Sequence, residues 1–405
     1  MHDNGFTLKD ELISNLPDKC RGILKTELAD YGVSTITENR KQPLNIYLIL
    51  TQGCNLSCPY CYQAKDFKNN NKQMTKEIID SAVKFAVKTF HETAIAFTLF
   101  GGEPFTRFDL IKYVIEKYPM FRYRIITNGY VLNEQPEVYD WVWNHKDNCN
   151  ISISLSALKF KYGKDYLEKT SKLLDLLNHI KGEIHYVIDD PQEDTHKEVI
   201  KIMEKCKSVR ISCARHNEKL KEIKEKVKEV FHKIADYLYF GETVVFGRCT
   251  WDTAFGNNTY RYNKGLPLYD LPSTFCGCGG HLYLAILPNG DLFPCDYFSI
   301  FPEMKMGDIY LGLNPNSIYL TKMQEWVNEA FEKCRNCTHI PNNDLRLCAR
   351  ALCFAENYEF NKNPFISTEA HCTANEIESD VYNYISKKAI ASGLDEVFYN
   401  KKKER

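Results

Sequence analysis

The sequence lacks long hydrophobic runs and an export signal. Its longest apolar stretches, at residues 46–50 and 282–287, are far shorter than the roughly 20 residues with which a helix spans a bilayer. The first residues, MHDNGFTLKDEL, contain no basic segment followed by an apolar one, as a secretory signal would. We therefore expect a soluble, cytoplasmic protein without a membrane partner.

An excess of charge of one sign is also missing. The 52 Lys and Arg residues nearly balance the 53 Asp and Glu residues, and the net charge is −1. Such a chain has no general electrostatic attraction to nucleic acid, so no nucleic-acid partner is expected. With 405 residues, 44% of them hydrophobic, the chain is long enough for two or three folded domains and is not a disordered protein.

Cysteine is abundant, with sixteen residues in the chain. In a reducing compartment, clustered cysteines are more often metal ligands than disulfides. Eleven of them fall into two groups, which are described below. The scattered ones are expected to be small apolar residues, with a catalytic or redox thiol as the alternative: Cys20, Cys149, Cys206, Cys213 and Cys249.

From residue 45 the sequence alternates short apolar runs with amphipathic segments. It predicts strands at residues 45–50, 94–100, 123–127, 150–155, 183–188 and 208–213, and helices that include 75–90, 193–205 and a charged helix at 218–238. The Lys and Glu residues of that charged helix are expected to face solvent. Six βα repeats indicate an α/β fold, a partial (β/α)6 TIM-like barrel. We expect an N-terminal extension at 1–44, the barrel at 45–240, a small α+β domain rich in turns at 241–385 and a tail at 386–405.

The first cysteine group directly follows the first predicted strand. Cys54, Cys58 and Cys61 have the spacing C-x3-C-x2-C, which brings three thiolates to one centre. The loop that leaves a strand of an α/β barrel at its carboxyl end lies on the face where active sites form. Three thiolates hold a four-iron cluster and leave one iron open to a ligand. A zinc site with a fourth ligand elsewhere, or buried free cysteines, are the alternatives.

Glycine motifs follow the next two predicted strands. Residues 100–104 read FGGEP, and residues 127–129 read TNG. Glycines at these positions would let the backbone approach a ligand closely, and Glu103 could pair with a ligand ammonium group. A GGEP segment alone could be merely a turn, but its order after a strand, the cysteine motif and a helix is far more specific.

In this order of motifs, residues 45–215 resemble the radical S-adenosylmethionine (SAM) enzymes. The resemblance implies that the three cysteines ligate a [4Fe-4S] cluster whose open iron binds SAM. It also implies that Gly101, Gly102 and Glu103 contact the methionyl amino group and that Tyr60 lies near the adenine. Asn128 and Ser154 are candidates for the ribose and the carboxylate.

The fourth strand departs from common family patterns. It reads SISLSALK, where many relatives have Asp-Gly after Ser-Leu. The helix that follows offers no arginine for the SAM carboxylate but only Lys159, Lys161 and Lys164.

The second group contains eight cysteines, enough for two four-cysteine sites: Cys276, Cys278, Cys295, Cys334, Cys337, Cys348, Cys353 and Cys372. Two structural zinc sites are the alternative interpretation. The pattern resembles the SPASM extension of radical SAM enzymes that modify peptides and proteins, with an insertion at THIPNNDLRL. The resemblance implies two auxiliary [4Fe-4S] clusters. One would be held by Cys276, Cys278, Cys295 and Cys353, and the other by Cys334, Cys337, Cys348 and Cys372.

Asp296 directly follows Cys295 and is a candidate catalytic base. The surrounding segment resembles the corresponding part of anaerobic sulfatase-maturating enzymes, in which the matching Asp serves as a base. The alternative is that Asp296 caps a turn or pairs with a lysine.

The resemblance implies an oxidoreductase, or peptide maturase, that cleaves SAM reductively. A reductant such as flavodoxin or ferredoxin would supply the electron. The expected substrate is a peptide or protein, including ribosomally made natural products. Residues 1–44 are too few for the leader-binding domain of many peptide maturases, which weakens but does not exclude a leader-directed peptide. The same chemistry on a small molecule, and a noncatalytic protein held together by metals, are the alternatives.

Overall fold

The computed structural model describes residues 43–63, 72–90, 94–206, 208–214, 219–240, 249–251, 283–334 and 353–391. The expected N-terminal extension lies outside the described residues except for its last two positions, as does the tail beyond 391. The same is true of five predicted or discussed cysteines: Cys20, Cys276, Cys278, Cys337 and Cys348.

The elements of the barrel are, in chain order, β1 (Leu44–Thr51), α4 (Lys76–Thr89), β2 (Ile95–Gly101), α5 (Phe108–Lys117), β3 (Arg122–Thr127), α6 (Tyr130–Glu134), α7 (Pro136–Asn144), β4 (Cys149–Ser154), α8 (Lys159–Tyr162), α9 (Tyr166–Lys169), α10 (Ser171–His179), β5 (Lys181–Ile188), α11 (Thr195–Lys205), β6 (Val209–Cys213), α12 (Lys224–Phe240) and β7 (Cys249–Trp251). The C-terminal elements are β8 (Tyr283–Ile286), β9 (Asp291–Phe293), β10 (Gly307–Asp308), β11 (Gly312–Leu313), α14 (Ile318–Thr321), α15 (Met323–Cys334), α16 (Phe354–Asn361) and α17 (Glu369–Ala391).

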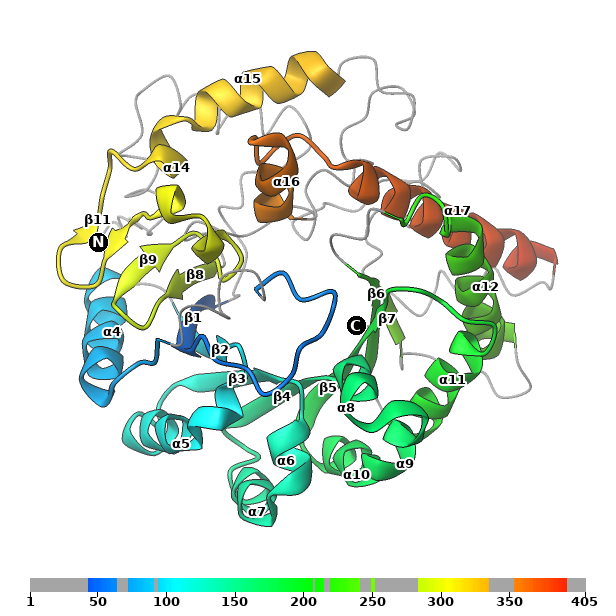
Figure 1. Ribbon diagram of the computed structural model, residues 1–405, viewed down its shortest axis with the longest axis horizontal. Helices are drawn as coiled ribbons and strands as arrows, with labels where there is room; N and C mark the ends of the chain where they lie inside the picture. The colour runs from blue at the N-terminus through cyan, green and yellow to red at the C-terminus, as the bar shows by residue number, and fades with distance from the viewer. Residues whose placement is uncertain are drawn as a thin grey trace, which may run out of the picture.

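Within the described residues the strands form one eleven-stranded sheet in the order β11-β10-β9-β8-β1-β2-β3-β4-β5-β6-β7. The strands from β8 to β7 in this order are parallel, whereas β9, β10 and β11 extend the sheet beyond β8 as antiparallel strands. Figure 1 shows the parallel strands curving inside a ring of helices that runs from α4 to α12. The predicted α/β partial barrel is confirmed. β7 and β8, from the range expected for the second domain, share its sheet.

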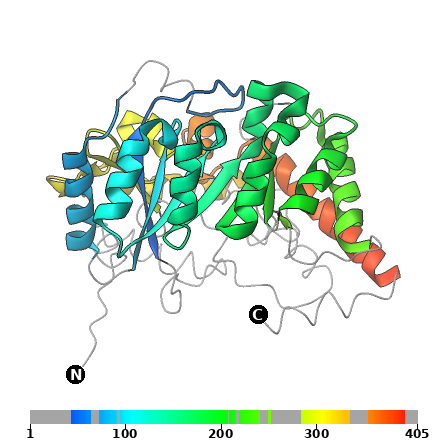
Figure 2. The same ribbon diagram turned by 90° about the horizontal axis from the view of Figure 1, so that it is seen from below.

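Successive side chains along a strand alternate between buried and half-buried positions. In β3, Tyr123 and Ile125 are buried, whereas Arg124 and Ile126 on the opposite face are half-buried. Successive side chains of a strand point to opposite faces, so one face of the sheet packs against the outer helices and the other lines its concave side. Figure 2 shows the outer helices side by side along the sheet.

The helices begin and end close to the predicted positions. The segment predicted at 75–90 forms α4, and the Thr75 hydroxyl caps it by accepting a hydrogen bond from the amide of Ile78 at 3.3 Å. Its Ile79, Ala82 and Ala86 side chains are fully buried against the sheet. The buried side chains recur every three or four residues, so one face of the helix packs on the core.

The charged helix α12 differs from the expectation that its polar faces are solvated. One of them packs along α17 (Figure 1), where Lys224 pairs with Glu376 at 2.9 Å and His232 with Asp380 at 2.8 Å. The partner helix lies about 150 residues further along the chain, so the local charge pattern could not reveal it. Among the helices of the described part, none has the length and apolarity required to cross a membrane.

Candidate functional site

The cysteine loop, residues 52–63, is built against the end of β2. The amide of Gly102 donates to the carbonyl of Thr51 and the amide of Glu103 to that of Gly53, both at 2.9 Å. A Cβ atom at Gly101 would lie 2.0 Å from the Thr51 oxygen, and one at Gly102 would lie 2.2 Å from the Gly53 oxygen. The backbone that approaches these glycines is thus that of Thr51, the last residue of β1, and of Gly53 in the cysteine loop. The predicted contact of Gly101 and Gly102 with a ligand stays a prediction.

Glu103 joins the ends of β2 and β3 and is fully buried. Its carboxylate accepts hydrogen bonds from the Thr127 hydroxyl and the Asn128 amide, both at 2.7 Å, and from the Phe105 amide at 3.0 Å. Burial raises the pKa of Glu103 to about 7, although these three donors oppose the shift. The side chain thus holds the two strand ends together. Its predicted contact with the amino group of a ligand stays a prediction.

Asn128 connects the end of β3 to the cysteine loop. Its Nδ2 group donates to Oδ1 of Asn55 at 2.8 Å and lies 3.8 Å from Sγ of Cys54. Its own Oδ1 accepts a hydrogen bond from the Tyr130 amide at 2.9 Å, which fixes the orientation of the side chain. The residue predicted to contact a ligand therefore also positions the first cysteine.

The three cysteines of the loop form no disulfide with a described residue. Cys54 is exposed, and Cys58 and Cys61 are half-buried. Burial raises the pKa of Cys58 to about 12, and the neighbouring charges of Cys61 and Cys54 add to the shift, so the three sulfur atoms interact with one another. The Leu56 amide donates to Sγ of Cys54 at 3.4 Å. Within the described ranges, no three His, Cys, Asp or Glu side chains lie together as the ligands of a single metal ion would. The thiolates of a [4Fe-4S] cluster bind separate irons and need not meet at one point, so three thiols on one loop with a backbone donor to sulfur fit that ligand set by residue type.

Tyr60 turns toward the loop after β4. Its hydroxyl lies 3.2 Å from Oγ of Ser156, and its ring contacts Phe160 edge to face. Ser156 lies in the 3-10 turn at Leu155–Leu158, two residues after Ser154, which ends β4. The predicted contact of Ser154 with a ligand stays a prediction.

Two of the lysines that follow β4, both in α8, contact other side chains. Lys159 pairs with Glu198 of α11 at 2.7 Å and donates to the Tyr186 hydroxyl. The ammonium group of Lys161 lies 4.8 Å from the centre of the Tyr130 ring. Neither contact was anticipated from the sequence.

Asp296 contacts the cysteine loop across 234 residues of sequence. Its carboxylate accepts a hydrogen bond from the hydroxyl of Tyr62, the residue after Cys61. The Tyr62 ring packs on Tyr297 with ring centres 4.1 Å apart, and the Tyr297 hydroxyl donates to Glu359 at 2.8 Å.

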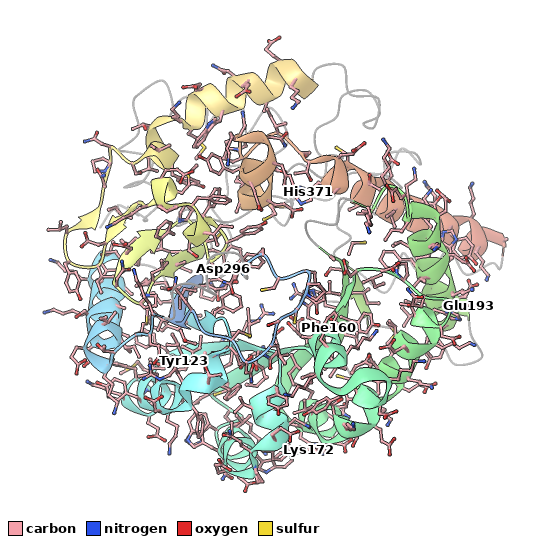
Figure 3. All side chains as sticks on the ribbon, in the orientation of Figure 1. Tyr123, Phe160, Lys172, Glu193, Asp296 and His371 are labelled. Carbon is pink, nitrogen blue, oxygen red and sulfur yellow. The ribbon has the colours of Figure 1, made fainter. Side chains whose placement is uncertain are left out.

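Asp296 and Phe160 lie toward the centre of the ring of helices, whereas Lys172 and Glu193 lie on its outer side (Figure 3). Sequence reasoning missed Tyr62.

The second cysteine group is described in part. Cys295 is buried beside the end of β9. Cys353 is buried at the N-cap of α16, and Cys372 is half-buried in the first turn of α17. The two helices are joined by His371, whose ring nitrogens lie 2.9 Å from Glu356 and 2.9 Å from Asn357. Cys334 ends α15, and its side chain is outside the description.

Two of the scattered cysteines belong to the hydrophobic core. Cys149 and Cys206 are 3% and 2% exposed. Cys213 ends β6 and is half-buried. The side chain of Cys249 in β7 lies outside the description. The two core positions agree with the expectation of small apolar residues.

Comparison with known proteins gives the family of the barrel. Residues 48–234 match the family model described as the Radical SAM superfamily. The "Radical SAM cyclopropyl synthase TigE" of Paramaledivibacter caminithermalis is 25% identical over 162 residues, which are 35% of this chain and 34% of that protein. A "putative glycyl-radical enzyme activating enzyme" of Methanocaldococcus jannaschii is 29% identical over 157 residues, which are 36% of this chain and 59% of that protein. The chain therefore spans between about a third and three fifths of the length of these relatives.

Solved structures share the fold over most of the chain. Streptococcus suis SuiB bound to S-adenosylmethionine has a TM-score of 0.57 and 15% identity, with 87% of this chain and 79% of that chain covered. Native anSMEcpe with bound AdoMet has a TM-score of 0.59 and 16% identity, with 88% of this chain and 100% of that chain covered. At this identity the likeness concerns the fold, and it includes elements beyond the barrel. Taken with the family match, the cysteine loop and the strand ends that hold it belong to a radical SAM domain, which this chain carries at residues 48–234.

Proposed function

We propose that this protein is a radical SAM enzyme that oxidatively modifies a peptide or protein. Cys54, Cys58 and Cys61 would hold a [4Fe-4S] cluster. When bound, the cluster supplies the electron that cleaves SAM to methionine and a 5′-deoxyadenosyl radical, which abstracts a hydrogen atom from the substrate. The observation that carries the proposal is the position of these thiols, on a loop fixed to the carboxyl edge of the parallel strands inside a radical SAM domain.

The residues around the loop would orient the cofactor and limit its motion. Gly102 and Glu103 hold the loop through two backbone hydrogen bonds, and Asn128 holds Asn55 and the Cys54 sulfur. Small displacements of reacting groups cost large factors in rate, so this bracing serves the chemistry directly. Tyr60 would cover the adenine, with Gly101 and Gly102 near the methionyl amino group. Asn128 and Ser154 remain the candidates for the ribose and the carboxylate.

The second cysteine group would hold two auxiliary [4Fe-4S] clusters. Cys295, Cys353 and Cys372 support this assignment, because these buried or half-buried cysteines of the C-terminal part form no disulfide with a described residue. The other proposed ligands lie outside the described side chains: Cys276, Cys278, Cys334, Cys337 and Cys348. Auxiliary clusters would accept the second electron of a net oxidation, which is then passed to an external carrier such as flavodoxin or ferredoxin.

Asp296 would act as the base of the reaction. Its contact with Tyr62 places the carboxylate beside the cysteine loop, where it can accept a proton from the substrate heteroatom as the substrate is oxidised. If the Asp296→Asn variant turned over substrate normally and formed 5′-deoxyadenosine normally, this role would be abandoned.

A peptide substrate is favoured by one comparison. A structure of anSMEcpe with bound AdoMet and the Kp18Cys peptide has a TM-score of 0.59 to this chain, with 16% identity and 88% of this chain and 99% of that chain covered. The test is anaerobic incubation of the reconstituted enzyme with SAM, a reductant and the peptides encoded beside its gene. Mass spectrometry should detect a peptide that has lost hydrogen, in step with 5′-deoxyadenosine. Release of 5′-deoxyadenosine with no change in any peptide, together with oxidation of a small molecule from a neighbouring pathway, would replace the peptide by that molecule.

A further inference from the structure

The concave side of the sheet carries charged residues that the mechanism above does not use. Arg124 of β3, Glu183 of β5 and Arg210 of β6 all lie on the face opposite the buried residues of their strands, with Ser152 of β4 between them. The two arginines and the glutamate are 35%, 30% and 21% exposed, respectively. They are therefore sheltered by the barrel and yet accessible to a solute.

These residues form a group with more donors than acceptors. One oxygen of Glu183, Oε1, accepts hydrogen bonds from Arg124 and from the Ser152 hydroxyl at 3.1 Å, and forms an ion pair with Nη2 of Arg210 at 3.2 Å. Within the described chain, Nε of each arginine has no hydrogen-bond partner. Two guanidinium groups provide ten N–H donors, and a single carboxylate cannot satisfy them.

The charge of the group is also unbalanced. Two arginines and one glutamate give these three residues a formal charge of +1. Burial raises the pKa of Tyr47 of β1, the charge of Asp296 adds to the shift and the charge of Arg124 opposes it, so both charges act on the same hydroxyl. An anionic group from a ligand would supply the missing charge and acceptors. Both arginines form ion pairs with the Glu183 carboxylate, so their guanidinium groups are already placed to bind a carboxylate.

The arginines lie below the cysteine loop, at a distance that a substrate side chain could bridge. Arg124 precedes Thr127, the last residue of β3, by three positions. At about 3.3 Å per residue it lies about 10 Å below the strand end where Asn128 meets the cysteine loop. If the carboxylate of a substrate side chain bound to the two arginines, the carbon atoms of that side chain would lie between the arginines and the cysteine loop.

We propose that Arg124 and Arg210 bind a carboxylate of the substrate, so that the modified peptide carries an acidic side chain at or beside the reacting residue. The inference rests on the proposed function for its meaning, but binding can be measured without turnover. A free carboxylic acid presents the same carboxylate as an acidic peptide side chain, and probes of both kinds distinguish the two.

The test uses the anaerobically reconstituted full-length enzyme with SAM and isothermal titration calorimetry. The probes are a capped tripeptide with a central glutamate, its glutamine counterpart, glutarate and inorganic phosphate. We expect the glutamate peptide to bind at least about tenfold more tightly than the glutamine peptide, because a hydrogen-bonded charge pair is lost. Arg124→Gln and Arg210→Gln should each weaken that binding about tenfold or more, and Arg124→Lys should weaken it less. The exposed Arg122 of the same strand provides the matched control, and Arg122→Gln should bind as the wild type does.

Glu183→Gln separates recognition from a purely structural role. It removes the internal competitor for the arginines, so the glutamate peptide should bind more tightly, whereas an ion network that only supports the barrel would not gain affinity. Equal binding of the two peptides, unchanged binding by both arginine variants, tighter binding of phosphate than of either acid, or no detectable binding at millimolar concentration would overturn the proposal. Tighter binding of glutarate than of the glutamate peptide would assign the site to a free acid and overturn the peptide assignment. If the acids bind and no SAM is cleaved, the proposed function fails while this inference stands.

Discussion

The Gly102→Ala substitution tests how the cysteine loop is held. The added Cβ would lie 2.2 Å from the Gly53 oxygen, and ordinary contact begins at 3.4 Å, so the loop would have to move by about 1.2 Å. Gly102 has no positive φ, so the cost comes from the contact and not from the backbone conformation. Overpacking of this kind costs about 1–3 kcal/mol, and loss of the Glu103 to Gly53 hydrogen bond adds about 1 kcal/mol.

The expected result is a loss of about 2–4 kcal/mol in the free energy of unfolding, together with a lower iron content per chain and at least about a hundredfold slower SAM cleavage. Denaturant unfolding, iron analysis and chromatography of 5′-deoxyadenosine measure these quantities. The control is Gly163→Ala, where φ is +65° but no atom lies within 4 Å of the new Cβ. It should cost about 1–3 kcal/mol in backbone strain and leave iron content and SAM cleavage unchanged. Wild-type stability and iron content in Gly102→Ala would refute the argument.

Two further predictions concern the surroundings of the loop, and a third concerns the contact between α12 and α17. Burial raises the pKa of Glu103 from 4.5 to about 7, so its contribution to stability is complete below about pH 4.5 and is lost as the pH rises through 7. The Glu103→Gln variant should therefore gain in unfolding free energy relative to the wild type as the pH is raised, and parallel curves would contradict this. Tyr62→Phe keeps the packing on Tyr297 but removes the donor to Asp296, so it should lower the yield of product per 5′-deoxyadenosine while changing stability by only about 1 kcal/mol; an unchanged yield would count against it. Asp380→Asn, which weakens the contact of α17 with His232, should cost less than about 1 kcal/mol in denaturant unfolding because the pair is partly exposed, and a larger loss would show that this estimate is wrong.

Local patterns in the sequence were sufficient for the barrel. The hydrophobic period and the turn residues predicted β1 to β6 and α4 to within about two residues, because each of these elements buries one face against the same core. The order of the cysteine motif, GGEP and the next strand was enough to predict the radical SAM domain, which the family match confirms.

The long-range contacts could not be predicted in the same way. Tyr62 meets Asp296, and α12 meets α17, across large separations in sequence that no local period records. Arg124 and Arg210 meet Glu183 only because the register of the parallel strands brings them to one face. The contact of Tyr60 with Ser156 depends on the path of a single turn. Each of these features follows from tertiary packing and not from local propensity.

The central claim is tested most directly by anaerobic reconstitution, followed by measurement of iron and of SAM cleavage in wild type and Cys58→Ala. The wild type should contain about twelve iron atoms per chain and release 5′-deoxyadenosine when reduced. Cys58→Ala should lose about four iron atoms and all cleavage, whereas Cys206→Ala, at a core cysteine, should retain both. Two or three bound zinc ions with no SAM cleavage by the wild type would contradict the account.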